Sequence, residues 1–245
     1  MRYEYTISPQ IKDGEAFDHD LHEALKLASM QDHEILHSSF NTNWIKECNI
    51  NPKVILDIGS YDGGDGIRLK YKFPEANVYS FEGDPARINL IEKYIKKFDV
   101  NFIPLAVSDH NGESQFYQSF VDGQALGQGS LLKHTDLYKS IYPHIKQEQD
   151  PITVKCISID SFCKENKIDE VDVAHIDVEG AEWYVLNGMG SIKPKMIFLE
   201  TIINKGEKRG WLGSFSADKD IHNMLTGMGY SLIKDIISDR LYVKE

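Results

Sequence analysis

The feature that most constrains the fold is an alternation of short apolar runs with helical patterns, which begins near Pro52. Each apolar run has the length of one buried strand, and each segment between two runs can hold a crossover helix. The alternation predicts an α/β domain with a parallel sheet and helices on both faces. The predicted strands are Val54–Leu56, Asn77–Phe81, Val100–Val107, Val171–Ile176 and Met196–Leu199, and helices are expected at Gly66–Phe73, Pro85–Phe98 and after Ala181.

Three further segments complete the predicted architecture. Residues 1–50 place Phe17, Leu21 and Leu25 on one apolar stripe, which predicts a helical N-terminal extension that caps the domain. The α/β domain is expected over residues 51–245, with an insertion at residues 108–169 between the third and fourth strands. The chain ends with a helical pattern near residues 218–228 and then two runs that predict a closing antiparallel hairpin, Tyr230–Lys234 and Arg240–Val243.

Composition excludes several classes of protein. The chain has 27 Lys and Arg against 38 Asp and Glu, a net charge of −11, so we expect no nucleic-acid partner. Unbroken hydrophobic runs reach only four residues, too few to span a membrane. The three cysteines show no metal or CxxC spacing, and the first residues lack the apolar stretch of a secretion signal. We therefore expect a cytoplasmic protein without disulfides. The oligomeric state is left open.

A glycine-rich turn follows the first predicted strand. Its residues run Asp57-Ile58-Gly59-Ser60-Tyr61-Asp62-Gly63. Ligands of parallel sheets bind beyond the carboxyl ends of the strands, and glycines there let a ligand approach the backbone. The spacing D-x-G-x-x-x-G differs from the G-x-G-x-x-G of dinucleotide enzymes. A purely structural turn is the alternative interpretation.

The end of the second strand supports a ligand at this place. Glu82 follows the strand directly, where an acidic side chain can accept hydrogen bonds from ribose hydroxyls. Asp84 precedes Pro85 and is more simply a helix cap. The two strand ends together predict a nucleoside-containing cofactor. Carboxylates in the turn would repel a pyrophosphate but tolerate a sulfonium, which favours S-adenosylmethionine over NAD.

Acidic residues also follow the fourth and fifth predicted strands. Asp177 and Glu179 come after one strand and Glu200 after the other, so the three carboxylates are expected to converge near the cofactor. Glu179 is equally well explained as a partner of backbone amides. His175, within the strand, is more typical of a hydrogen-bonded core histidine than of a base. Three carboxylates can hold a divalent metal, but no histidine or cysteine motif supports a metal, so direct carboxylate chemistry is favoured.

These motifs resemble the FkbM family of S-adenosylmethionine-dependent methyltransferases over most of the chain from Lys53 onward. The most specific similarity is the run from Ile176 to Glu182, which is similar to the family's D-V-E-G-A-E signature, with Val185, Leu186 and Gly188 following it. His175 stands where the family usually has lysine. Weaker similarities are Leu56–Ser60 with Gly63, Ala106–Asp109 with Gly112, Gly129–Leu131 and Ile157–Phe162.

The resemblance implies a Rossmann-like sheet of seven strands in a methyltransferase catalytic domain. It also implies O-methylation of a hydroxyl on a small molecule, most often a sugar or glycan. The implied cofactor is S-adenosylmethionine, with its methionine end at Asp57, Gly59, Ser60 and Gly63, its ribose at Glu82 and its adenine at Ala106–Ser108. The full set of predicted cofactor contacts is Asp57, Gly59, Ser60, Tyr61, Gly63, Glu82, Gly83, Ala106, Val107, Ser108 and Asp177.

Methyl transfer needs an aligned acceptor oxygen and a base near its proton. We expect Asp177 or Glu179 as the base and Glu200 as a residue that orients the acceptor, with His175 and His134 as outside candidates. The insertion carries Tyr138 and Tyr142, which suit either an acceptor wall or ordinary packing. Two rival hypotheses are a non-catalytic adenosyl-binding module and an NAD-linked oxidoreductase.

Overall fold

The computed structural model describes residues 40–92, 95–122, 124–125, 127–148, 150–201, 218–236 and 239–245. Most of the predicted helical extension therefore lies outside the described residues. Its last part contains one short helix, α2 (Asn43–Glu47), whose Ile45 is completely buried.

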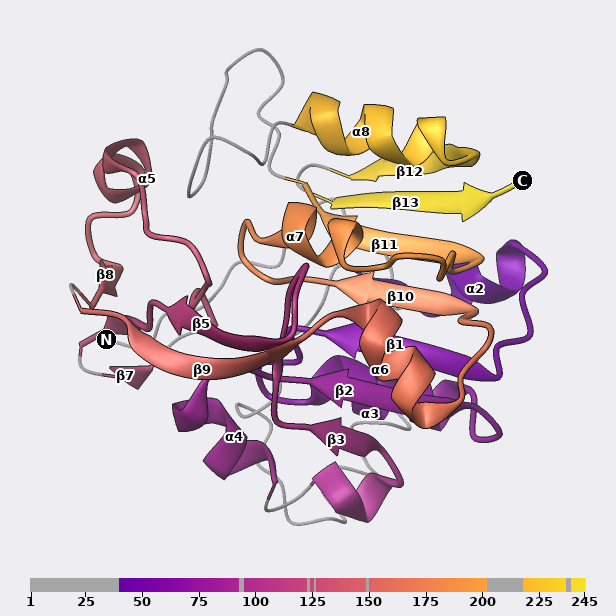
Figure 1. The fold of residues 1–245 in the computed structure, drawn as a ribbon, viewed down its shortest axis with the longest axis horizontal. Coiled ribbons are helices and arrows are strands. Elements are labelled where there is room, and N and C mark those ends of the chain that lie inside the picture. Colours follow the sequence, from indigo (N-terminus) through magenta and orange to yellow (C-terminus); the bar gives the residue numbers. More distant parts are fainter. Residues whose placement is uncertain are drawn as a thin grey trace.

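The main sheet has seven strands in the order β12-β13-β11-β10-β1-β2-β3 (Figure 1). Its central strands β11, β10, β1, β2 and β3 pair in parallel, whereas β13 runs antiparallel to β11 and pairs with β12 as a hairpin. The predicted parallel sheet with a closing hairpin is confirmed. The strands are β1 (Val54–Ile58), β2 (Asn77–Phe81), β3 (Asn101–Ile103), β10 (Val173–Ile176), β11 (Met196–Glu200), β12 (Tyr230–Ile236) and β13 (Asp239–Lys244).

Alternate residues of the central strands enter two different cores. Leu56 and Ile176 belong to a cluster that includes Val185 and Leu225, so α7 and α8 cover this face. Ile55 and Val173 belong to the opposite cluster, under α2 and α3. Because both faces are covered, most residues of the central strands are apolar, as the sequence pattern indicated. The covering helices are α3 (Gly64–Lys72), α6 (Ile159–Asn166), α7 (Glu182–Asn187) and α8 (Asp218–Gly227).

One predicted strand was wrong. Val100–Val107 is not continuous: β3 ends at Ile103, and β4 (Ala106–Val107) belongs to a second sheet. Pro104, which has no backbone N–H and interrupts strand pairing, lies at the break. The Leu105 N–H then donates to the Ile103 carbonyl at 2.8 Å, which turns the chain. This turn brings Ala106 and Val107 to the end of the main sheet.

The predicted helix Pro85–Phe98 was also too long. It is divided into α4 (Pro85–Ile91) and a 3₁₀ helix, η2 (Ile95–Phe98). Ile91 and Ile95 are both fully buried, and both approach Gly63: a Cβ at that glycine would lie 3.3 Å from Ile91 Cγ2 and 3.0 Å from Ile95 Cδ1. Two side chains, the last of α4 and the first of η2, therefore converge on one point at the start of α3.

The insertion forms two small sheets that lie beside the carboxyl ends of the central strands (Figure 1). In the first, β9 (Ile152–Ile157) pairs in parallel with β4 and antiparallel with β5 (Gly112–Phe116). The second contains β6 (Ser119–Val121), β7 (Gln124–Ala125) and β8 (Lys146–Gln147), with α5 (Asp136–Ile141) between β7 and β8. Among the described residues, no helix combines the length and the apolar character needed to cross a membrane.

Candidate active site

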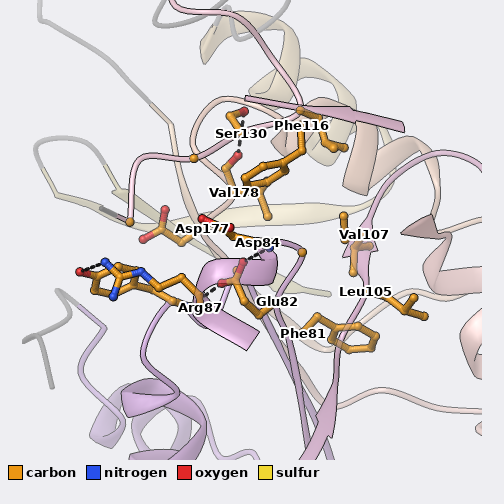
Figure 2. Close-up of a pocket in the computed structure, with 17 residues that line it drawn as sticks. Phe81, Glu82, Asp84, Arg87, Leu105, Val107, Phe116, Ser130, Asp177 and Val178 are labelled. Atoms are coloured by element: carbon orange, nitrogen blue, oxygen red, sulfur yellow. Dashed lines mark hydrogen bonds between the residues drawn. The ribbon is translucent and has the colours of Figure 1, made fainter. Parts of the chain in front are cut away.

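A cavity lies where β1 and β2 end and the insertion begins (Figure 2). Predicted cofactor residues from four separate segments line it, namely Gly59, Tyr61, Glu82, Gly83, Ala106, Val107 and Asp177. The sequence analysis missed the other lining residues, which are Phe81, Asp84, Arg87, Leu105, Phe116, Gly127, Gly129, Ser130, Leu131 and Val178.

Gly59 forms the floor of the cavity. Its φ is +87°, and its N–H donates to the Phe81 carbonyl of the neighbouring strand at 3.0 Å. A Cβ on Gly59 would lie only 1.7 Å from the carbonyl oxygen of Asp177. Glycine is therefore required both by the left-handed backbone and by the close approach of the chain that follows β10.

Glu82 connects the ends of β1 and β2. Its carboxylate accepts the Tyr61 N–H at 2.8 Å and the Asp84 N–H at 2.7 Å. Burial raises the pKa of Glu82 to about 7, against the opposite effect of these two backbone hydrogen bonds. The carboxylate is held rigidly at the cavity, where its remaining lone pairs can accept ligand hydroxyls.

Arg87 and Tyr61 form one wall of the cavity. The guanidinium carbon lies 4.0 Å from the centre of the Tyr61 ring, and Nη2 donates to the phenol oxygen at 2.7 Å. Gly127 of the insertion packs against the ring, since a Cβ there would be 2.9 Å from Tyr61 Cδ2. The sequence analysis named Tyr61 as a cofactor contact but missed Arg87, because an arginine in the first turn of a helix is ordinary.

The insertion supplies the opposite wall. In Figure 2, Phe116, Ser130 and Val178 lie across the cavity from Glu82 and Phe81. The Ser130 hydroxyl donates to the Val178 carbonyl at 3.4 Å, which ties the insertion to the segment after β10. Gly129 leaves room for the Phe116 ring, whose Cε1 would be 2.8 Å from a Cβ.

Four predicted cofactor residues do not line this cavity. Asp57 is fully buried and bonds Ser80 and His175. Ser60 is 4% exposed, and Gly63 precedes α3 with φ +77° and donates its N–H to the Ser60 carbonyl. Ser108 is buried, with its N–H on the Ile157 carbonyl. These four residues are neighbours of lining residues in the sequence and do not line the cavity themselves.

The three predicted catalytic carboxylates do converge. One oxygen each from Asp177, Glu179 and Glu200 lie within 4.8 Å of one another. Glu179 has φ +53°, and Gly180 follows with φ +91°, so the chain turns sharply after β10. The Glu182 carboxylate stabilises this turn, because it accepts the N–H groups of Val178 and Gly180.

The three carboxylates differ in acidity. Asp177 is accessible from the cavity, but protein on its other sides excludes water and raises its pKa to about 6; His175 lowers this pKa, and further repulsion comes from Asp239, Asp65 and Asp57. Burial raises the pKa of Glu179 and Glu200 well above the usual value; repulsion by Asp177 adds to this at Glu179, and repulsion by Glu179 and Asp177 adds to it at Glu200. With a pKa of about 6, Asp177 is mostly ionised at neutral pH.

Carboxylate oxygens are also the atoms that hard divalent cations bind. Within the described part of the chain, no histidine or cysteine atom joins the group of Asp177, Glu179 and Glu200. The predicted preference for direct carboxylate chemistry stays a prediction.

The two histidines that were less favoured candidates for the base occupy different environments. His175 is 4% exposed, and its Nδ1–H donates a hydrogen bond to the Asp57 carboxylate inside the sheet. His134 is also buried, and its ring lies 4.0 Å from that of Tyr138; burial lowers the pKa of His134 to about 4. The pKa of Tyr138 is raised, first by burial and then by neighbouring groups that include Glu179 and Glu200. Helix α5 thus brings Tyr138 close to the carboxylates.

The strand order, the closing hairpin and a cavity at the carboxyl ends of β1 and β2 define a Rossmann-like methyltransferase fold. The SAH-bound methyltransferase PaMTH1 of Podospora anserina has this fold, with a TM-score of 0.50 and 12% identity over 96% of this chain and 91% of that chain. The chain belongs to the family described as the methyltransferase FkbM domain, which matches residues 57–232. The resemblance found in the sequence motifs is confirmed.

A curated relative is the 2-O-methyltransferase NoeI of Sinorhizobium fredii (strain NBRC 101917 / NGR234). It is 32% identical over 157 residues, which are 60% of this chain and 62% of that protein. The match therefore spans about three fifths of the length of the curated relative.

Proposed function

We propose that this protein is an S-adenosylmethionine-dependent O-methyltransferase that acts on a hydroxyl of a small molecule, namely a sugar or glycan. The observation that carries the proposal is the position of Asp177. This residue lines the cavity that contains Gly59 and Glu82, and it also belongs to the carboxylate cluster with Glu179 and Glu200. A cofactor site and a group of proton acceptors and donors therefore share one residue.

The charges around the cavity support S-adenosylmethionine in preference to NAD. Glu82, Asp84 and Asp177 line the cavity, and such carboxylates repel a pyrophosphate and attract a sulfonium or an ammonium. Arg87, a cation in the lining, is engaged with Tyr61. Glu82 would accept the ribose hydroxyls, and the apolar side chains of Leu105, Ala106 and Val107 would surround the adenine.

Bound S-adenosylmethionine supplies an electrophilic methyl group on its sulfonium. The protein has two tasks, which are to place the acceptor hydroxyl and to accept its proton. Asp177 suits the second task because it lines the cavity and also belongs to the carboxylate cluster. Burial favours the protonated forms of Glu179 and Glu200, which would donate hydrogen bonds to acceptor oxygens. Glu200 would thus orient the acceptor, as the sequence analysis expected.

A sugar or glycan acceptor agrees with the polar character of this cluster. Carboxyl groups form hydrogen bonds with hydroxyls as both donors and acceptors when only some of them are protonated. Tyr138 and His134 add buried aromatic surface beside the cluster. The name of the curated relative, a 2-O-methyltransferase, supports oxygen as the methylated atom.

Isothermal titration tests the cofactor first. We expect micromolar binding of S-adenosylmethionine and no binding of NAD. The protein is then incubated with S-adenosylmethionine and a panel of neutral monosaccharides and oligosaccharides, and release of S-adenosylhomocysteine is measured. Release that depends on one acceptor supports the proposal. Cofactor binding without release on any acceptor would favour a non-catalytic adenosyl-binding module, and NAD binding would favour an oxidoreductase.

A further inference from the structure

A row of four side chains crosses the main sheet beneath the cofactor cavity. The register pairs Phe198 of β11 with His175 of β10, His175 with Asp57 of β1, and Asp57 with Ser80 of β2. Residues paired across neighbouring strands point to the same face of a sheet. The four side chains therefore form one continuous row, and none of them is more than 4% exposed.

The Asp57 carboxylate is bonded on both sides within this row. Oδ1 lies 2.9 Å from His175 Nδ1, and Oδ2 accepts the Ser80 hydroxyl at 2.9 Å. Above them, α3 comes so close that a Cβ on Gly66 would lie 2.0 Å from Ser80 Oγ. The carboxylate is closed off from water, and an ionised carboxylate in such a place needs a positive partner.

His175 is the basic side chain that meets this need. Among the described residues, it is the only one that forms an ion pair with Asp57. Burial lowers the pKa of His175, but the hydrogen bond with Asp57 and the charges of Asp65, Asp57 and Asp177 outweigh burial and raise the pKa to about 9. Asp65 forms a separate ion pair with Arg68, whose Nη1 donates to its carboxylate at 2.9 Å.

Two aromatic rings pack near the imidazole. The Phe40 ring stacks on His175 with centres 5.3 Å apart and planes 17° apart, and the Phe198 ring lies 5.8 Å away at 25°. Faces of aromatic rings attract cations. The packing therefore orients a charged imidazole towards Asp57.

The ion pair lies one pleat below the floor of the cavity. Asp57 and His175 are paired in the register of β1 and β10. Gly59 and Asp177 each follow two residues later, so they stand at equivalent places on the two chains. The Asp177 N–H donates to the Ile58 carbonyl at 2.9 Å, which continues the pairing up to the cavity. A shift of Asp57 relative to His175 would therefore move Gly59 relative to Asp177.

We propose that His175 is a positioning residue whose buried positive charge holds Asp57 in the cross-strand row and thereby fixes the Gly59–Asp177 floor of the cofactor cavity. His175 is required for its positive charge and not for proton transfer by its imidazole. The part of this inference that concerns the cofactor rests on the proposed function.

Three variants and one control test the role of charge. His175→Lys keeps a cation whose aliphatic stem can pack against Phe40 and Phe198. His175→Gln keeps a hydrogen-bond donor but removes the charge, and the double variant His175→Gln with Asp57→Asn removes both charges. His222→Gln is the control, because His222 bonds the neutral Tyr242 hydroxyl at 3.0 Å in a different part of the fold. Each protein is studied by thermal unfolding and by titration with S-adenosylhomocysteine.

We expect His175→Gln to lower the unfolding midpoint by about 6 °C or more, because it leaves a buried charge without a partner. Its affinity for S-adenosylhomocysteine should fall at least tenfold (roughly the effect of 1.4 kcal/mol). His175→Lys should bind within about threefold of the native protein, a difference well below that tenfold step. The double variant should recover most of the midpoint, and His222→Gln should bind like the native protein.

Two results would overturn the proposal: native affinity in His175→Gln, or a loss in His175→Lys as large as in His175→Gln. If His175→Gln does not fold, folding of the lysine and double variants still supports a charge requirement, whereas failure of the lysine variant rejects it. If the native protein binds no S-adenosylhomocysteine, the proposed function fails, and the unfolding midpoints alone decide whether the buried charge is required.

Discussion

The α-carbon of Gly59 faces the carbonyl oxygen of Asp177 so closely that an added Cβ would lie 1.7 Å from it. This contact joins the glycine turn after β1 to the acidic segment after β10, two motifs that are 118 positions apart (177 − 59) in the sequence. The floor of the cavity is therefore in direct contact with the backbone of the proposed base.

Gly59→Ala should disrupt this contact. The substitution combines backbone strain at φ +87° with a steric clash, so we expect a loss of about 3 kcal/mol or more in the free energy of unfolding. Cofactor binding should be abolished in the protein that still folds. Gly229→Ala is a matched control, since Gly229 has φ +86° but no atom within 4 Å of the position that the added methyl group would take. The difference between the two variants in urea unfolding measures the clash; equal losses would reject it.

The rate of methyl transfer should depend on the ionisation of Asp177. Its pKa is raised to about 6, so the base is protonated at lower pH and available at higher pH. With saturating cofactor and acceptor, kcat should therefore rise as pH increases through about 6 and then level off. Asp177→Asn should keep the fold and reduce kcat by roughly 10²–10⁴-fold.

Variants of the other two carboxylates, compared with Asp177→Asn, identify the base. Glu179→Gln and Glu200→Gln should weaken acceptor binding and keep the rise of kcat near pH 6, because we assign that rise to the ionisation of Asp177. Unchanged turnover in Asp177→Asn, or loss of the pH dependence in Glu179→Gln alone, would transfer the role to Glu179.

Glu82→Gln should weaken binding of the cofactor. The glutamine has one carbonyl oxygen in place of two carboxylate oxygens, while both the Tyr61 and Asp84 N–H groups need an acceptor. We expect affinity for S-adenosylmethionine to fall by about 10- to 100-fold, equivalent to one or two charge-assisted hydrogen bonds. Titration calorimetry measures the loss. The control is Glu75→Gln on the exposed surface, and an equal effect of both variants would contradict a specific role for Glu82.

Binding of the cofactor should also respond to the ionisation of Glu82. Its pKa is raised to about 7 by burial, and the ionised carboxylate is the stronger acceptor for ribose hydroxyls. Affinity should therefore be higher at pH 8 than at pH 6 in the native protein, and this difference should disappear in Glu82→Gln. A difference that persists in the variant would assign the pH dependence to another group.

Gly66→Ala should destabilise the protein although alanine favours helices. The methyl group would lie 2.0 Å from Ser80 Oγ and 3.0 Å from Asp57 Oδ2, so α3 has to move away from the sheet. Overpacking of this kind costs about 1–3 kcal/mol. Gly227→Ala in α8 meets no atom within 4 Å and should be neutral or stabilise by up to about 1 kcal/mol. Chemical denaturation of both variants checks the contrast, which would be lost if Gly66→Ala were also neutral.

The alternation of apolar runs and helical patterns along the chain was sufficient to predict a parallel sheet with a closing hairpin. It was also sufficient to predict that the acidic residues at the strand ends meet. Parallel strands place their carboxyl ends at one edge, so carboxylates that follow β10 and β11 had to approach each other, and Asp177, Glu179 and Glu200 do. The break at Pro104 was readable in principle, since proline interrupts pairing, but the apolar residues on both sides of it favoured one continuous strand.

The sequence by itself thus determined the kind of fold, the family and the edge of the sheet where the site lies, because these depend on periodicity and on short motifs. Only the tertiary structure decided that Asp57 faces His175 and Ser80 inside the sheet, because this depends on the register of three strands distant in sequence. It also decided that Arg87 covers Tyr61 and that burial raises the pKa of both Asp177 and Glu179. Contacts and pKa values of this kind arise from burial and from neighbours that are remote along the chain.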